Sequence, residues 1–360
     1  MAAHRWQRRF LYMFIEKKDI KSYTPEELRE EFKKLEIKPY RADQIIDWLY
    51  KGVTSFDEML NLPKDLRKNL DEQYYINKLS LLKKQVSKED GTVKYLWELV
   101  DKNSLETVLM KYHHGYTVCV STQVGCRQGC VFCASCLNGF TRNLLPSEII
   151  DQILFVQKES GIKISNIVLM GIGEPLDNYD NVLKFIRLAN HHKCLNIGLR
   201  HITLSTCGLA DKVDKLAQNN LQLTISISLH ATTEEIRSSI MPVNKRFSLE
   251  ELLNACERYT EISGKRLSFE YAMIKGVNDS KDDAHRLAEI SKRLGAHINL
   301  IPLNHVAERK LEASEQTSIN NFYSLLKEKG AIVTIRRRLG SDIDASCGQL
   351  RKKISAKSNE

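Results

Sequence analysis

Apolar strand-like runs alternate with amphipathic helical runs from Cys119 to about residue 350, and this alternation constrains the fold more than any other sequence feature. The strand-like runs include NIVLMG, ITLST, LTISISLH, LSFEYAMI, INLIPL and IVTIRRR, with helical runs such as YDNVLKFIRLANH and INNFYSLLKEKG between them. About six or seven such units predict a parallel sheet covered by helices. Because about 230 residues are few for a closed eight-fold barrel, we expect an α/β fold built on a partial, open β/α barrel.

Smaller regions precede and follow the barrel, which we assign to residues 119–350. Residues 17–78 carry apolar side chains at helical spacing, in TPEELREEFKKL, RADQIIDWLY, SFDEML and PKDLRKNLDEQY, and predict a helical accessory domain. Residues 79–118 predict a β meander at the edge of the barrel, and the strand TVCVSTQV leads on from it. We expect residues 1–16 to be an extension outside the fold, and residues 351–360 to be a basic, mobile tail.

The charge balance favours a partner rich in phosphate groups. Lysine and arginine number 54 against 45 aspartates and glutamates, which gives a formal charge of +9. The same excess also fits a solvated basic surface on an enzyme with no such partner. The sequence contains no apolar run of the roughly 18 residues that a membrane helix needs, so we expect no transmembrane helix. We also expect the protein to be cytoplasmic and monomeric.

Four of the nine cysteines lie between Cys126 and Cys136, too close in sequence to cross-link distant parts of a fold. Cys126, Cys130 and Cys133 follow the spacing C-x3-C-x2-C. Three such thiolates can hold three irons of a 4Fe–4S cluster and leave the fourth iron for a ligand with amino and carboxylate groups, such as S-adenosylmethionine (SAM).

Other interpretations of these cysteines remain open. They include buried apolar cysteines and a zinc knuckle, although no nearby histidine completes a zinc site. Cys136 follows Cys133 with the same x2 spacing, and as a fourth ligand it would block SAM and indicate an electron-transfer protein.

The segment from Gly173 to Pro175 directly follows the apolar strand IVLM. Ligands of α/β folds bind at the carboxyl ends of strands, where this segment lies. Glycine allows the backbone to approach a ligand closely, and Glu174 offers a carboxylate to the amino group of SAM. The sequence therefore predicts a SAM contact here.

Ordered motifs from about Lys18 to Leu350 resemble the RlmN/Cfr family of radical SAM RNA methyltransferases. They are Leu105-Glu106-Thr107, CVSTQVGC, the cysteine loop, GFTRNL, MGIGEPL, LSTCG, SLHA, GVNDS, IPLN and DIDASCGQL. Members commonly have Ser, Thr or Gly where this chain has Cys136. The resemblance implies a 4Fe–4S cluster on Cys126, Cys130 and Cys133, with SAM held by Gly173, Glu174, Ser205, Ser228, Leu229, His230 and Asn304.

The resemblance also implies the reaction. Cys347 would take a methyl group from one SAM and become S-methylcysteine, while a second SAM supplies a radical. Cys119 would then form a transient disulfide with Cys347, and Glu106 would accept the proton from C2 of the adenine. The implied substrates are 23S rRNA, free or in an early assembly intermediate, and tRNA, with flavodoxin or ferredoxin as electron donor. MGIGEPL favours C2 over the C8 methylation of the Cfr branch.

Basic residues are candidates for phosphate contacts. They are Arg41, the stretch Lys64 to Lys68, Arg336 to Arg338, and Arg351 to Lys353. We expect the target base to be extruded from its stack and held in the barrel mouth. Two other classes of protein also remain compatible with the sequence. An electron-transfer protein needs Cys136 as a ligand, whereas a non-catalytic RNA-binding protein has no use for Cys119 and Cys347.

Overall fold

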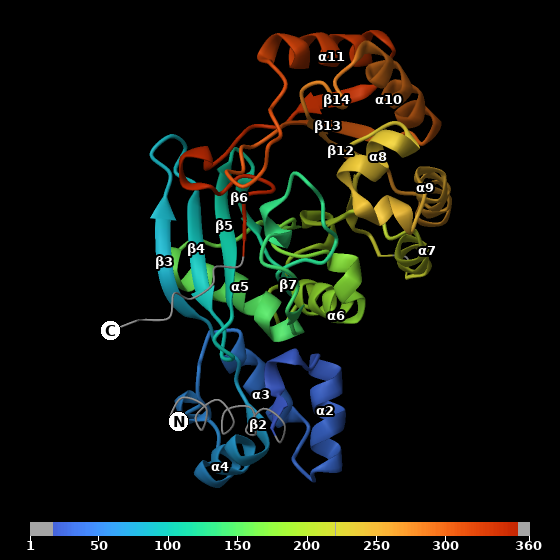
Figure 1. Cartoon of the computed structure of the whole chain (residues 1–360). Coiled ribbons are helices and arrows are strands. Elements are labelled where there is room, and N and C mark those ends of the chain that lie inside the picture. The colour runs from blue at the N-terminus through green and yellow to red at the C-terminus, as the bar shows by residue number, and fades with distance from the viewer. Residues whose placement is uncertain (1–16, 220, 352–360) are drawn as a thin grey trace.

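The computed structural model describes residues 17–219 and 221–351, shown in Figure 1. The expected extension at residues 1–16 and all but the first residue of the expected tail at 351–360 lie outside the described residues. Within the described part of the chain, no helix is long and apolar enough to cross a membrane.

A ten-stranded sheet with the order β14-β13-β12-β11-β10-β9-β6-β5-β4-β3 organises the protein. Its parallel part consists of β6 (Gly115–Cys119), β9 (Asn166–Leu169), β10 (Ile202–Thr206), β11 (Thr224–Ser228), β12 (Ser268–Met273), β13 (His297–Pro302) and β14 (Ile332–Ile335). Because β14 and β3 are the two edges of the sheet, it does not close. This architecture confirms the predicted α/β fold with an open barrel.

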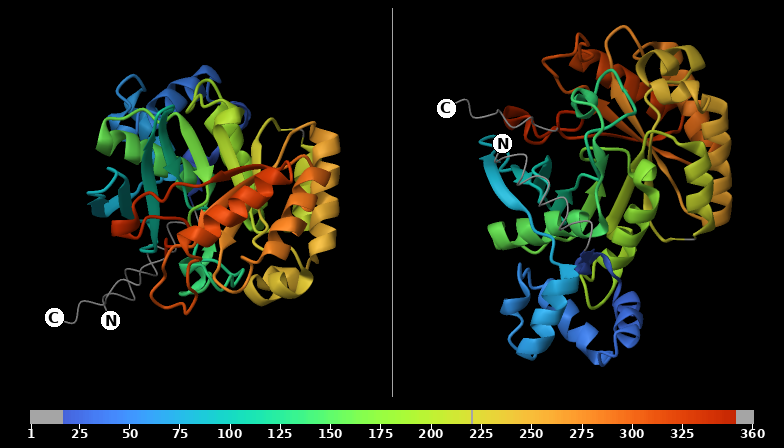
Figure 2. Two further views of the ribbon diagram at one scale, coloured as in Figure 1. Left: turned by 90° about the horizontal axis from the view of Figure 1, so that it is seen from above. Right: turned by 60° about the horizontal axis from the view of Figure 1, so that its bottom comes forward.

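Helices cover the outer face of the parallel strands (Figure 2). They are α5 (Pro146–Ser160), α6 (Tyr179–Asn190), α7 (Ala210–Gln218), α9 (Leu249–Ser263), α10 (Lys281–Arg293) and α11 (Gln316–Glu328). The main apolar core lies between these helices and the sheet, and it takes every second residue of the strands, such as Ile167 and Leu169 in β9. The intervening residues therefore face the inside of the barrel.

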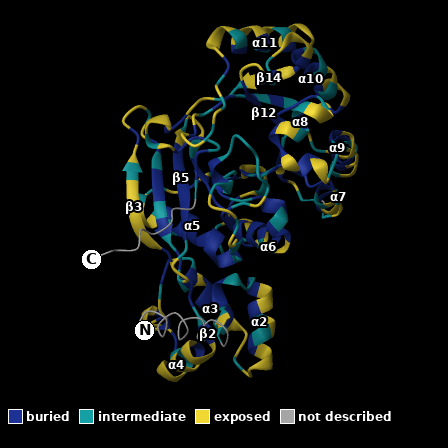
Figure 3. Cartoon of the chain, viewed as in Figure 1, coloured by how far each residue is buried: buried dark blue, intermediate teal, exposed yellow. Residues whose placement is uncertain are grey.

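The meander is continuous with the barrel sheet. It comprises β3 (Ser80–Val86), β4 (Val93–Glu98), β5 (Ser104–Tyr112) and β6, and β6 pairs in parallel with β9. The boundary expected after residue 118 therefore runs through a strand. Figure 3 shows that the outermost strand, β3, is largely exposed.

The segment TVCVSTQV forms two strands instead of the single strand we expected. β6 ends at Cys119, and the short β7 (Gln123–Val124) pairs with β8 (Arg142–Asn143). Between them, the Gln152 side chain of α5 accepts from Ser121 N–H (2.8 Å) and donates to Ser121 C=O (2.9 Å). These side-chain bonds take the place of ladder bonds, so the strand is interrupted there.

The accessory domain is a separate helical body with its own apolar core (Figure 1). Its helices are α2 (Pro25–Lys34), α3 (Tyr40–Leu49) and α4 (Lys64–Gln73). The α2 helix begins at a capping box formed by Thr24 and Glu27. SFDEML, which we expected to be helical, forms one 3-10 turn, η2 (Phe56–Glu58).

Candidate active site

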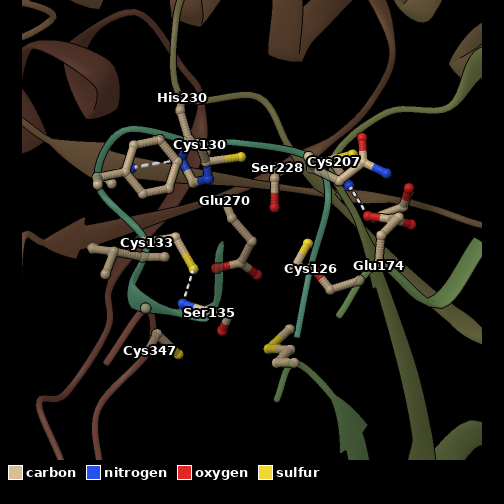
Figure 4. A pocket seen from close by; sticks show the side chains of 18 of the residues that line it. Cys126, Cys130, Cys133, Ser135, Glu174, Cys207, Ser228, His230, Glu270 and Cys347 are labelled. Atoms are coloured by element: carbon tan, nitrogen blue, oxygen red, sulfur yellow. Dashed lines mark hydrogen bonds between the residues drawn. The ribbon is translucent and has the colours of Figure 1, made fainter. Parts of the chain in front are cut away.

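The three motif cysteines lie on the loop between β7 and β8 and line one cavity of about 970 Å³, part of it open to solvent. We call it the cluster cavity (Figure 4). The loop leaves β7 through Gly125, whose φ is +75°. A Cβ atom there would lie 1.7 Å from the Gly139 carbonyl oxygen, so only glycine fits.

The cysteine side chains fit a multi-iron cluster. All three line the same cavity, and three cysteine thiolates are the ligand type that binds the irons of such a cluster. In the described chain, no three His, Cys, Asp or Glu residues are placed to hold a single metal ion. Burial raises the pKa of the Cys126 thiol to about 12, and it also raises the pKa values of Cys130 and Cys133. Such thiols become thiolates when bound iron compensates their charge. Ser135 N–H already donates to Cys133 Sγ (3.4 Å).

Cys136 lies outside the cluster cavity. Its thiol donates to the carbonyl oxygen of Cys133 (3.2 Å). The Arg309 guanidinium donates to Cys136 Sγ (3.1 Å) and to the same Cys133 carbonyl (3.2 Å). The Cys136 sulfur is thus engaged in hydrogen bonds outside the cavity lining, an arrangement that favours three cluster ligands over four.

Most residues expected to bind SAM lie where expected, at the carboxyl ends of the strands. Gly173, Glu174, Ser205, Ser228, His230 and Asn304 all line the cluster cavity. Leu229 does not, because it is fully buried in the apolar core. Ser228, the last residue of β11, and His230 line the cavity, whereas Leu229 between them packs in the apolar core. The Leu229 side chain therefore faces away from the cluster cavity, and the expected SAM contact at this position stays a prediction.

Glu174 is a buried carboxylate at the cavity wall. It accepts from the backbone N–H groups of Leu176 (3.0 Å) and Cys207 (2.7 Å), and none of the ion pairs in the described chain involves it. Burial raises its pKa. A buried carboxylate without a cation is a suitable partner for an ammonium group of a ligand.

His230 is neutral and held in place by its neighbours. Its Nδ1 atom accepts from Ala272 N–H (3.0 Å), and its ring meets the Phe132 ring edge-on, with centroids 4.8 Å apart. Burial lowers the pKa of His230 to about 3. The imidazole therefore serves as a rigid, uncharged part of the cavity wall.

Cys119 and Cys347 line a second cavity of about 540 Å³, which we call the thiol chamber. It shares Met170, Ile301, Asn304, Arg336 and Cys347 with the cluster cavity. The Asn304 amide donates to the Cys347 carbonyl (3.0 Å), and Ala134 N–H of the cysteine loop donates to the Gly348 carbonyl (2.7 Å). The C-terminal segment is thereby fixed against the loop. Burial raises the pKa of Cys119 to about 12.

Glu106 lines neither cavity. Its carboxylate accepts from Arg351 N–H (2.9 Å) and lies 3.6 Å from Lys94 Nζ, with both side chains buried. It shares a face of β5 with Val108, the residue paired with Cys119. The structure thus places Glu106 near the thiol chamber, beneath the C-terminal segment.

Three residues that line these cavities, Arg336, Cys207 and Glu270, were not predicted from the sequence to belong to the site. Arg336 does not extend outward toward phosphate. Its guanidinium pairs with buried Glu270 (3.2 Å) and reaches the Met170 sulfur (3.3 Å). Cys207, which is not one of the expected site residues, lines the cluster cavity. A lone carboxylate in the apolar run LSFEYAMI was the one available signal for Glu270, whereas Cys207 was marked only by its place in the motif LSTCG.

An open β/α barrel with a loop of three cysteines at the carboxyl ends of its strands defines a radical SAM protein. The family model of the radical SAM superfamily matches residues 120–288, and that of the ribosomal RNA large subunit methyltransferase N-terminal domain matches residues 18–76.

Similar proteins narrow the class further. The chain is 50% identical over 336 residues to the probable dual-specificity RNA methyltransferase RlmN of Clostridium novyi, covering 93% of this chain and 98% of that protein. It is 49% identical to the probable dual-specificity RNA methyltransferase RlmN of Alkaliphilus oremlandii, and the match covers 94% of this chain and 99% of that protein. The crystal structure of a radical SAM methyltransferase from Sphaerobacter thermophilus is 40% identical, with a TM-score of 0.87 and coverage of 92% and 99%. The chain belongs to the RlmN family of radical SAM RNA methyltransferases.

Proposed function

We propose that the protein methylates C2 of an adenine in 23S rRNA and in tRNA. Its relatives carry the name dual-specificity RNA methyltransferase, and 23S rRNA and tRNA are the two substrates that the sequence motifs imply. The observation that carries the proposal is the meeting of Cys119 and Cys347 in one chamber that shares a wall with the cluster cavity. RNA substrates of this kind place the protein in the cytoplasm.

The cluster cavity would hold both cofactors. Cys126, Cys130 and Cys133 would bind the 4Fe–4S cluster, and Glu174 would pair with the amino group of SAM. Gly173, Ser205, Ser228, His230 and Asn304 would form the rest of the SAM site. When bound, the cluster and SAM supply a transferable methyl group and a carbon radical. A flavodoxin or ferredoxin would provide the electrons.

Two thiols would divide the remaining chemistry between them. Cys347 lines both cavities, so its sulfur can receive a methyl group on the cofactor side and present it to the base on the other. After the methyl carbon has joined C2, the base is tethered to the Cys347 sulfur. Cys119 then attacks that sulfur as a thiolate. The S–S bond forms as the bond between sulfur and the new methyl carbon breaks, its electron pair goes to the base, and the methyl carbon takes up a proton while C2 loses its own. An external dithiol then reduces the Cys119–Cys347 disulfide to both thiols.

Glu106 is the proposed proton acceptor for C2. In the present arrangement its carboxylate accepts from Arg351 N–H and lies beside Lys94. Its action therefore requires the backbone around Arg351 to move away when RNA binds. A carboxylate that gains access to the chamber only with substrate bound would keep the tethered state from breaking down prematurely.

Mass spectrometry of nucleosides from a strain lacking the gene tests the proposed function. We expect 2-methyladenosine to disappear from both 23S rRNA and tRNA, and to return when the gene is restored. Loss of 8-methyladenosine would move the reaction to C8. No change in either nucleoside would remove adenine methylation as the function.

A further inference from the structure

The inner face of the barrel is polar at the end opposite the cysteine loop. Side chains near the amino ends of six strands line a chamber of about 1120 Å³ that is widely open to solvent, and we call it the amino-end chamber. They are Thr117, Asn166, Thr203, Thr224, Ser268 and His297. The interiors of closed β/α barrels are packed with branched apolar residues. A hydroxyl- and amide-lined interior therefore suits a polar occupant.

The rim of this chamber carries positive charge. Arg200 precedes β10 and Arg266 precedes β12, and both are exposed and line the chamber. Neither takes part in an ion pair with any described residue, whereas the chamber's single lining carboxylate, Glu270, is paired with Arg336 (3.2 Å). Two unneutralised guanidinium groups at an open mouth favour phosphate.

The amino-end chamber adjoins the reactive thiols. Tyr112, Val168, Met170 and Arg336 line both this chamber and the thiol chamber. On β6, Thr117 lines the former and Cys119 the latter, a separation of about 7 Å along the strand. Tyr112 and His114 stack at this wall with ring centroids 5.2 Å apart, and they offer an aromatic face to a base.

We propose that the amino-end chamber is the binding site through which the target nucleotide of RNA reaches the thiol chamber, with its flanking phosphates held by Arg200 and Arg266. This inference rests on the proposed RNA methylation. The extruded base and ribose occupy the polar interior, while the rest of the RNA stays outside the barrel at the rim. The RNA and SAM then approach Cys347 from opposite ends of the barrel, so neither has to leave before the other binds.

Charge reversal at the rim tests the phosphate contacts. The test variant is Arg200→Glu/Arg266→Glu. The control variant, Lys292→Glu/Lys329→Glu, changes the net charge by the same amount on α10 and at the end of α11, away from the chamber. The probe is a fluorescein-labelled stem-loop RNA with an unpaired adenosine in its loop, titrated at two salt concentrations with SAM present. We expect the rim variant to bind about tenfold more weakly and with a shallower salt dependence than the control pair. Equal affinities for the two variants would overturn the rim contacts.

Obstruction of the interior tests the route itself. Thr224→Trp places a large ring in the amino-end chamber, whereas Ile332→Trp places the same ring on exposed β14, outside it. Iron content and SAM binding show that each variant has an intact cluster cavity. We expect RNA methylation by Thr224→Trp to fall about a hundredfold below that of Ile332→Trp, because the base cannot reach the thiols. Equal rates would overturn the route.

The two proposals fail in different ways. If the unaltered enzyme methylates no RNA but the rim variant still binds RNA more weakly than its control, the proposed function is wrong and only the phosphate contacts at the rim stand. If both altered variants methylate RNA as their controls do, methylation stands and this site is wrong.

Discussion

Cys136 differs from the other cysteines of its loop in what surrounds its sulfur. The thiol donates a hydrogen bond to the Cys133 carbonyl oxygen and accepts one from Arg309, and Cys136 does not line the cluster cavity. We expect Cys136→Ala to bind about four irons per chain after anaerobic reconstitution, and Cys126→Ala to lose the cluster. Iron and sulfide analysis with electron paramagnetic resonance measures both. Loss of the cluster in Cys136→Ala would make Cys136 a ligand and support electron transfer.

His230 predicts a pH dependence of stability. Burial lowers its pKa from 6.5 to about 3, so below pH 6.5 the unfolded chain binds a proton that the folded chain does not. Stability should therefore fall as the pH drops from 6.5 toward 3, by about 2 kcal/mol at pH 5 from this group. His230→Asn retains an acceptor for Ala272 N–H and tolerates the positive φ of 55°.

The measurement is urea denaturation of both proteins at pH 7 and pH 5. The loss of stability between these two pH values should be about 2 kcal/mol smaller in His230→Asn than in the unaltered protein. An equal loss in the two proteins would show that other groups account for the acid sensitivity.

Residues whose chemistry depends on local spacing could be predicted from the sequence. The three cluster cysteines belong to this group, because one short loop has to deliver all three. Where no family motif marks them, residues whose role depends on a distant partner could not be predicted. Arg336 pairs with Glu270, which lies 66 residues earlier in the chain, and only the fold reveals that it points inward.

At the scale of elements, the periodic helices and strands were predictable, but their lateral pairing was not. The hydrophobic pattern of the meander indicates strands without saying which edge continues into the barrel. The parallel pairing of β6 with β9 joins residues about 50 positions apart, such as Cys119 and Val168. Likewise, a glutamine on α5 interrupts TVCVSTQV, and no local signal in that segment announces the break.

One buried ion pair fastens the accessory domain to the barrel. Lys21 Nζ lies 2.6 Å from Asp151 Oδ1 on α5 and donates to the Asn77 carbonyl (3.0 Å), with both charged side chains fully buried. Lys21→Met leaves the Asp151 charge buried without a cation, so we expect it to destabilise the protein by about 3–5 kcal/mol. Urea denaturation followed by tryptophan fluorescence measures this loss.

Two further variants separate the buried charge from other effects. Lys18→Met breaks an exposed pair with Glu31 and should cost at most about 1 kcal/mol. Lys21→Met/Asp151→Leu removes both charges and should recover most of the loss. If Lys21→Met were as mild as Lys18→Met, the buried pair would not be what fastens the two domains.

At the scale of the whole molecule, the two ends of the barrel domain meet at the proposed reaction site. Cys119 ends β6, its first strand, and Cys347 follows β14, its last strand. The C-terminal segment crosses back over the open side of the sheet, where Leu339, Ala345 and Leu350 pack with Cys119 in a small apolar cluster. Family motifs could suggest this meeting from the sequence, but composition and periodicity could not.

The division of work between these thiols leads to a last prediction. Without Cys119, no thiol can attack the Cys347 sulfur, so the reaction should stop with RNA bonded to the protein. Cys119→Ala purified from cells should carry RNA that survives denaturation and is removed by ribonuclease, as seen by gel electrophoresis and mass spectrometry. Cys347→Ala should carry none, nor should the control Cys256→Ala, whose altered residue lies buried in α9. Equal adduct in Cys119→Ala and Cys347→Ala would refute the assignment, because the tether requires the Cys347 sulfur.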